Sequence, residues 1–170
     1  MTLEQLAAHV EIQQVLYRYC RGVDRGDPAL IASVYHPGAI DHHGAWTGPG
    51  QDFGAYLVPA MDQAPLIGQH HITNALIEVD GETARVESYF VAFHPENDAG
   101  GRARHVLVGG RYLDQFARRD GAWKITERRV VLDLSRPLER VEGWAGAAYF
   151  PAGARREADP SSGLFSRDAT

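Results

Sequence analysis

The stretch "HITNALIEVDGETARVESYFVAF", residues 71–93, decides the fold class. Two runs rich in β-branched and aromatic residues flank the dipeptide Asp80-Gly81, which is typical of a tight β-hairpin turn. The stretch "HVLVGGRYLDQFARRDGAWKITERRVVLDL", residues 105–134, repeats this arrangement around Asp120-Gly121. Two successive hairpins predict a four-stranded antiparallel meander, with a polar, Gly-rich loop over residues 95–104 between them.

The residues before these strands have helical signals. Thr2 and Gln5 in "TLEQ" fit a capping box, and apolar residues at helical spacing follow, so we predict a helix from residue 3 to about 23. Asp27 before Pro28 is expected to begin a short second helix. A third apolar face covers residues 53–61, where Pro59 is expected to kink or end the helix.

Between the second and third helices, "AIDHH" (39–43) predicts a short strand and "TGPG" (47–50) a turn. Gly109-Gly110, in the middle of a later strand, predicts a bulge or bend. Helices followed by antiparallel strands predict an α+β fold, in which the helices gather on one face of a curved sheet. Such a sheet can fold around a pocket.

Length and composition exclude several classes of protein. A chain of 170 residues with 44% hydrophobic and 23% charged residues is expected to form one domain, residues 1–150, followed by a flexible C-terminal tail, residues 151–170. The net charge of -5, without a basic stripe, argues against nucleic-acid binding. No apolar run approaches the roughly 20 residues that span a bilayer. The N-terminus lacks a signal-peptide pattern, so we expect a cytoplasmic protein.

The eight histidines raise the question of a metal site. The sequence has no "HExxH" motif, and a lone Cys20 excludes a cysteine cluster, so we predict no metal and no cofactor. The alternative is a histidine base held by a carboxylate. His70 and His71 are adjacent in a predicted strand, so only one of them can face a pocket. Asp24, where the first helix ends, is a candidate partner; it could equally be an aspartate exposed in a turn.

Five segments together resemble the SnoaL-like branch of the nuclear transport factor 2 superfamily over about residues 5–135. They are "YCRGVDRGD" (19–27), "IDHHG" (40–44), "GQHHITN" (68–74), "IEVDGETA" (77–84) and "GGRYLDQFARRDGAWKI" (109–125). Within that superfamily the chain is similar to hexachlorocyclohexane dehydrochlorinase, scytalone dehydratase and bile-acid 7α-dehydratase, all cofactor-free lyases. The resemblance implies a cone-shaped α+β barrel with a deep pocket between helices and sheet.

The resemblance also implies roles for particular residues. The catalytic aspartate of the family falls on Asp24 and its general-base histidine on His70. In a regular strand, Asn74 would share the pocket face of His70, and a bulge would bring His71 there instead. The basic position that accompanies the pair in some members falls on Arg128, which could instead be a surface arginine paired with an acid.

Three further residues enter through the same resemblance. Tyr19 lies five residues before Asp24, as in the bile-acid dehydratase pattern, which favours loss of an oxygen leaving group; simple packing would also explain it. His42 falls where scytalone dehydratase has a pocket tyrosine, so scytalone is not the expected substrate. His105 could line the cavity or cap a strand at its rim.

The sequence therefore predicts a cofactor-independent lyase of the dehydratase type, acting on a small apolar alicyclic, aromatic or polyketide-like substrate. The predicted catalytic residues are Asp24, His70, Tyr19 and Arg128, and the predicted substrate-binding residues are His42, Asn74 and His105. An isomerase or cyclase that uses the same pair, and a non-catalytic protein that binds a small molecule or a partner, remain alternatives. The sheet face could form a homodimer or homotrimer.

Overall fold

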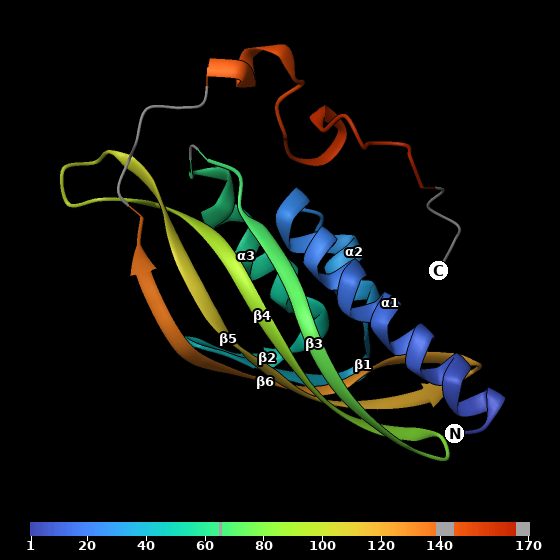
Figure 1. Cartoon of the computed structure of the whole chain (residues 1–170). Coiled ribbons are helices and arrows are strands. Elements are labelled where there is room, and N and C mark those ends of the chain that lie inside the picture. Colours follow the sequence, from blue (N-terminus) through green and yellow to red (C-terminus); the bar gives the residue numbers. More distant parts are fainter. Residues whose placement is uncertain (65, 139–144, 166–170) are drawn as a thin grey trace.

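The computed structural model describes residues 1–64, 66–138 and 145–165, and it confirms the predicted α+β class. A curved six-stranded sheet carries helices on one face (Figure 1). The α-helices are α1 Leu3–Arg25, α2 Pro28–Ser33 and α3 Phe53–Asp62, and the strands are β1 Tyr35–His43, β2 Trp46–Pro49, β3 Gln69–Asp80, β4 Thr83–Asn97, β5 Ala103–Arg119 and β6 Ala122–Pro137. Short 3₁₀ helices are η1 Gly50–Asp52, η2 Ala145–Tyr149 and η3 Arg156–Ala158. Within these ranges no helix has the length and apolar character needed to cross a membrane.

The predicted meander forms the larger part of the sheet. Strands β3 to β6 pair in sequence order, and the complete order is β2-β1-β6-β5-β4-β3. Asp120 and Gly121 both have positive φ, 53° and 79°, as a type I′ hairpin turn requires. The sequence did not indicate that β1 pairs with β6 in parallel, which makes the sheet mixed.

Two predicted connections are shorter in the structure. Strands β4 and β5 extend into the predicted loop 95–104, so that only residues 98–102 connect them. Within that turn the Asp98 carboxylate accepts bonds from the backbone of Gly100 and Arg102. The predicted turn at residues 47–50 is also wrong: it belongs mainly to β2, and the chain reverses at Gly44, whose φ is 64°.

Within the described residues, register shifts interrupt the strand pairing at four places, and two of them bear on the sequence predictions. The β5–β6 register shifts at Gly109-Gly110, as expected from the sequence, and a Cβ at Gly110 would lie 2.2 Å from the Val131 carbonyl oxygen. Only glycine fits this close approach. A second shift, between Ile72 and Ala75 in β3, was not predicted.

The ends of the helices follow the predicted signals. The Thr2–Gln5 capping box is present, with bonds of 3.1 and 2.9 Å. Helix α1 ends at Gly26 in the left-handed conformation (φ 61°), which glycine adopts without steric cost. Asp27 then caps α2 by accepting a 3.0 Å bond from the Leu30 backbone. Because α1 continues to Arg25, Asp24 lies in its last turn rather than beyond it.

The core lies between the helices and the concave face of the sheet. Helix α1 contributes Ile12, Leu16 and Tyr19, and the sheet contributes large side chains such as Tyr112 and Phe116, all nearly inaccessible to solvent. Helix α3 passes through Pro59 without ending and continues to Asp62. Helix α1 contacts β3, and its last turn, which carries Asp24, lies beside that strand (Figure 1).

The described part of the C-terminal segment contacts the helices. Arg156 donates to the Gly26 carbonyl and to Asp62, and Arg25 forms a 3.3 Å ion pair with Asp159. Tyr149 and Phe150 are largely exposed, and Trp144 lies outside the described residues. The domain boundary at residue 150 stays a prediction, while residues 155–159 are tied to α1 and α3.

Candidate active site

An aspartate from α1 and a histidine from β3 meet in a tight pair. Asp24 Oδ1 lies 2.6 Å from His70 Nδ1, and Asp24 Oδ2 accepts a 3.0 Å bond from the His70 backbone N–H. The side chains are only 10% and 8% exposed. Because both carboxylate oxygens bind the same residue, the imidazole has one orientation, with Nδ1 on the carboxylate and Nε2 at the free end of the ring. This is the arrangement that a histidine base requires.

Strand alternation explains why His70, and not His71, faces the helices. His70 pairs with Ala92, which is fully buried on the helix-facing side. His71 is exposed on the opposite side, where its ring meets Phe93 at a centroid distance of 6.2 Å. Of the two adjacent histidines, His70 is therefore the one that faces the helices.

The pair borders a depression of about 230 Å³ between α1 and β3. Its other lining residues are Tyr17, Cys20, Arg21, Arg25 and Ile72. Burial, opposed by the charge of Arg128, raises the pKa of the Cys20 thiol to about 12, so this cysteine stays protonated and is a poor nucleophile. The reactive groups in this depression are the carboxylate and the imidazole.

A second histidine lies against the pair. The ring centroids of His70 and His94 are 5.0 Å apart, in an edge-to-face arrangement. Desolvation by the surrounding protein atoms, followed by the charges of His70 and His43, lowers the pKa of His94 to about 4, although part of this side chain is exposed to solvent. His94 is therefore neutral near pH 7. His94 is within electrostatic range of both His70 and His43, and we call these three residues the histidine group.

Tyr19 and Arg128 form a separate, buried centre. Arg128 is 0% exposed, is bound by both oxygens of Asp114 at 2.8 and 2.7 Å, and lies between the rings of Tyr19 and Tyr112 at 4.2 and 4.1 Å. Burial disfavours its charge, yet the facing Asp114 carboxylate raises the pKa of Arg128 above its ordinary value. The surface alternative for Arg128 is thus wrong. The expectation that it reaches a substrate is not supported, because the guanidinium is closed to solvent, although its Nη1 has no hydrogen-bond partner among the described residues.

Tyr19 is 1% exposed, and its hydroxyl points to His43 Nδ1 at 3.5 Å. Burial raises the pKa of this phenol, so it remains a hydrogen-bond donor. The described hydrogen-bond contact of the Tyr19 hydroxyl is with His43 rather than with the Asp24–His70 pair.

The three predicted substrate-binding residues do not join the site. Asn74 is exposed and bonded to Thr73, because the bulge after Ile72 shifts the alternation of β3. His105 binds the Ile67 carbonyl at 3.0 Å and meets Phe93 on the face opposite His70. The expectation for Asn74 is therefore wrong, because side-chain direction depends on strand register. Of the two alternatives for His105, the cavity is not supported, and its bond to Ile67, just before β3, agrees with a residue at the rim of a strand.

His42 is the third predicted substrate-binding residue, and its neighbour His43 faces the helices in its place. His42 lies on the outer face, 3.8 Å from Glu127 and 3.4 Å from the Thr47 hydroxyl. His43 faces the helices instead, stacked on Phe53 at 4.4 Å. The "DHH" motif could have pointed to either residue, and the sequence analysis missed His43. Within the described ranges, no set of three or more His, Cys, Asp and Glu side chains is arranged to hold a metal ion.

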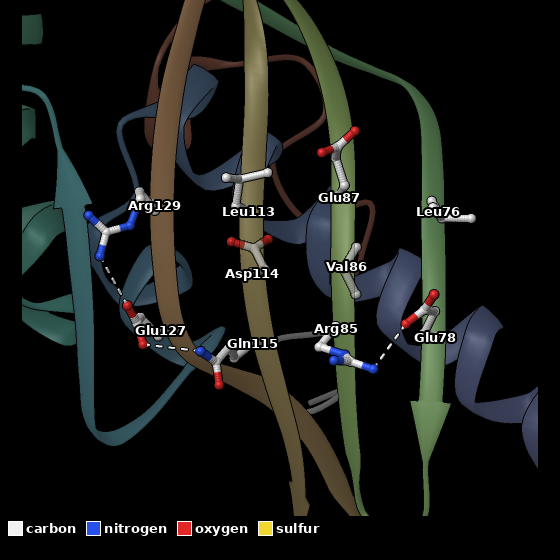
Figure 2. A pocket seen from close by; sticks show the side chains of 10 residues that line it. All are labelled: Leu76, Glu78, Arg85, Val86, Glu87, Leu113, Asp114, Gln115, Glu127 and Arg129. Atoms are coloured by element: carbon white, nitrogen blue, oxygen red, sulfur yellow. Dashed lines mark hydrogen bonds and ion pairs between the residues drawn. The ribbon is translucent and has the colours of Figure 1, made fainter.

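A second depression, of about 410 Å³, lies on the outer face of the sheet. Figure 2 shows its side chains on four neighbouring strands, and their charges pair with one another: Arg85 with Glu78 at 3.2 Å, and Arg129 with Glu127 at 3.4 Å. Large apolar side chains on the same face are exposed, among them Leu76 at 68% and Leu134 at 50%. This surface offers no acid–base pair.

Comparison with known proteins agrees with this architecture. A SnoaL-like domain model matches residues 4–129. An uncharacterized protein of Mycobacterium tuberculosis is 28% identical over 131 residues, covering 75% of this chain and 87% of the relative. A putative scytalone dehydratase from Novosphingobium aromaticivorans superposes with a TM-score of 0.71 at 20% identity, covering 83% of this chain and 94% of that one. A hexachlorocyclohexane dehydrochlorinase from Novosphingobium barchaimii superposes with a TM-score of 0.70 at 22% identity, covering 84% of this chain and 97% of that one.

The curved sheet and its helical cover are those of the nuclear transport factor 2-like class of α+β proteins. The carboxylate–imidazole pair lies between them. The chain belongs to the SnoaL-like domain family. The two structural likenesses are below 25% identity and concern the fold alone.

Proposed function

We propose that the protein is a cofactor-independent lyase that removes a proton from a carbon atom of a small, largely apolar alicyclic, aromatic or polyketide-like substrate. The observation that carries this proposal is the 2.6 Å contact between Asp24 and His70, both nearly buried. In this mechanism the His70 Nε2 lone pair takes the proton, and Asp24 holds the ring and stabilises the imidazolium that forms. Loss of water from the neighbouring carbon completes a dehydration.

The surroundings support an apolar ring as the substrate. Aromatic side chains of Trp46, Phe53 and Tyr56 pack against one another in tilted arrangements beside His43, with ring-centroid distances of 4.7 to 6.4 Å. Flat or alicyclic molecules pack well on such faces. A carbanion or enolate would form next to the neutral His94, which can accept or donate a hydrogen bond.

Isomerisation is a second candidate, favoured by one observation. His94 lies 5.0 Å from His70, so a proton taken by one imidazole could return to the substrate through the other without loss of a group. The product distinguishes the two reactions, because dehydration changes the substrate mass and isomerisation does not.

The test uses 3-hydroxycyclohexanone, a small alicyclic β-hydroxy ketone, as the probe. The wild-type protein should release cyclohexenone, detected by its enone absorbance, and should exchange the hydrogen next to the carbonyl for deuterium in D₂O. His70→Ala should lose both activities, while His71→Ala, which alters the neighbouring ring on the other face, should keep them. Equal rates in the two variants, or no exchange with the wild-type protein, would refute the proposal.

We also propose that the outer face of the sheet pairs with a second copy of the chain. Leu76 and Leu134 are exposed there among charges of both signs, a composition that can match itself across a two-fold axis. Leu76→Glu should shift the mass in solution toward the monomer, and Leu6→Glu on α1 serves as the control. A monomeric wild-type protein would contradict this proposal.

A further inference from the structure

His43, like His70, has a carboxylate beside its Nδ1, but at a longer distance. Its Nδ1 lies 3.6 Å from Asp41 Oδ2 and 3.5 Å from the Tyr19 hydroxyl. One face of the ring is stacked on Phe53, with an interplanar angle of 18°. The ring therefore has its Nδ1 edge toward a carboxylate and its Nε2 at the free end, and 26% of the side chain is accessible.

The buried charges around His43 favour a positive partner. Asp41 is 0% exposed, and its Oδ2 accepts a 2.7 Å bond from the Tyr35 hydroxyl. Its Oδ1 is buried without a hydrogen-bond partner among the residues that the structure describes. The other buried charges in contact here, Arg128 and Asp114, neutralise each other. The Asp41 carboxylate therefore faces His43 Nδ1 with only one of its two oxygens hydrogen-bonded to a described residue.

The remaining candidates for the leaving-group side are poorly placed. Tyr19 and Arg128 are 1% and 0% exposed, and the guanidinium is occupied by Asp114 and two rings. His94 contacts the ring of His70, which places it beside the base. Within the histidine group, His43 is the member that has no described contact with His70, and 26% of its side chain is accessible.

We propose that His43 is a second catalytic residue, the acid that protonates the departing oxygen while His70 takes the proton from carbon. This inference rests on the proposed lyase function. The C–H bond breaks as its hydrogen passes to His70 Nε2, its electron pair forms the C=C bond, and the C–O bond breaks as the His43 Nε2 proton passes to oxygen, so that water leaves. Solvent restores both imidazoles. Asp41 and Tyr19 are positioning residues that hold Nδ1 of His43.

The dependence of rate on the leaving group tests this role. The probes are 3-hydroxycyclohexanone, whose hydroxide needs a proton to depart, and 3-(4-nitrophenoxy)cyclohexanone, whose nitrophenolate does not. His43→Gln should slow the loss of water by about 10²- to 10⁴-fold, as expected for removal of a general acid. The same variant should slow the loss of nitrophenolate by less than about 10-fold, because the His70 base is intact.

The control variant is His42→Gln, which changes the adjacent ring on the outer face and should alter neither rate. Circular dichroism and the thermal midpoint of His43→Gln establish that the variant folds. Equal slowing of both probes would reduce His43 to a structural residue, and unchanged rates would remove it from the reaction; either result overturns the inference but leaves the role of His70 standing. A wild-type protein inert toward both probes would reject the lyase function and this inference with it.

Discussion

Removal of the Asp114 carboxylate tests the conclusion that Arg128 is held for the fold rather than offered to a substrate. Asp114→Asn keeps the shape of the side chain and removes its charge, leaving the guanidinium buried without a counter-ion. Breaking a buried pair on one side costs about 3–5 kcal/mol in the free energy of unfolding. For a chain of this size each kcal/mol lowers the melting temperature by about 2–4 °C, so the expected decrease is about 6–20 °C.

The sheet provides a matched control. Arg111 and Asp133, on the same two strands, form an equally two-pronged pair at 2.9 and 3.1 Å, but their side chains are 28% and 40% exposed. An exposed pair contributes about 0–1 kcal/mol, so Asp133→Asn should barely change stability. Urea unfolding of both variants gives the two free energies directly. A result in which Asp114→Asn and Asp133→Asn cost the same would refute the argument from burial.

Three further outcomes are expected. The NMR titration of His94 should have a midpoint near pH 4. The stability that its neutral form contributes is therefore present above about pH 6.5 and is lost as the pH falls toward 4. His70→Phe should raise that midpoint, and an unchanged midpoint would contradict an electrostatic effect of His70 on His94. Asp159→Asn should speed amide hydrogen exchange over residues 155–159 by removing the partner of Arg25, and unchanged exchange there would contradict this. Chelator treatment should leave activity unchanged; inactivation that zinc or iron reverses would contradict the metal-free mechanism.

Much of the fold follows from local signals that the sequence states directly. The capping box at Thr2, the turn at Asp120-Gly121 and the bulge at Gly110 are where their chemistry predicts, because each depends on neighbours in the chain. The parallel pairing of β1 with β6 brings together residues far apart in sequence, and no local pattern encodes it.

The same distinction separates the site residues that were predicted well from those that were not. Asp24 and His70 were named through a family resemblance, and the structure brings them into contact. His42 was chosen where its neighbour His43 faces inward, and Asn74 was placed with His70 because an unpredicted bulge was not counted. A one-residue change of register reverses the face of a side chain, and register is set by tertiary pairing rather than by residue type.

Burial was the other property that the sequence left open. The sequence analysis left two alternatives for Arg128, a residue that faces the substrate or a residue on the surface. The structure supports neither, because Arg128 is buried among Asp114, Tyr19 and Tyr112. These three partners lie on α1 and β5, so their contact with Arg128 depends on the assembled core.

The protonation of the His70 ring tests the central claim most directly. ¹⁵N NMR at about pH 9, well above the ordinary histidine pKa near 6.5, reports which ring nitrogen carries the proton. The contact with Asp24 predicts that Nδ1 is protonated and Nε2 carries the lone pair that takes a proton from carbon, and that Asp24→Asn disturbs this state. A ring protonated on Nε2 in the wild-type protein, or one indifferent to Asp24→Asn, would contradict the account.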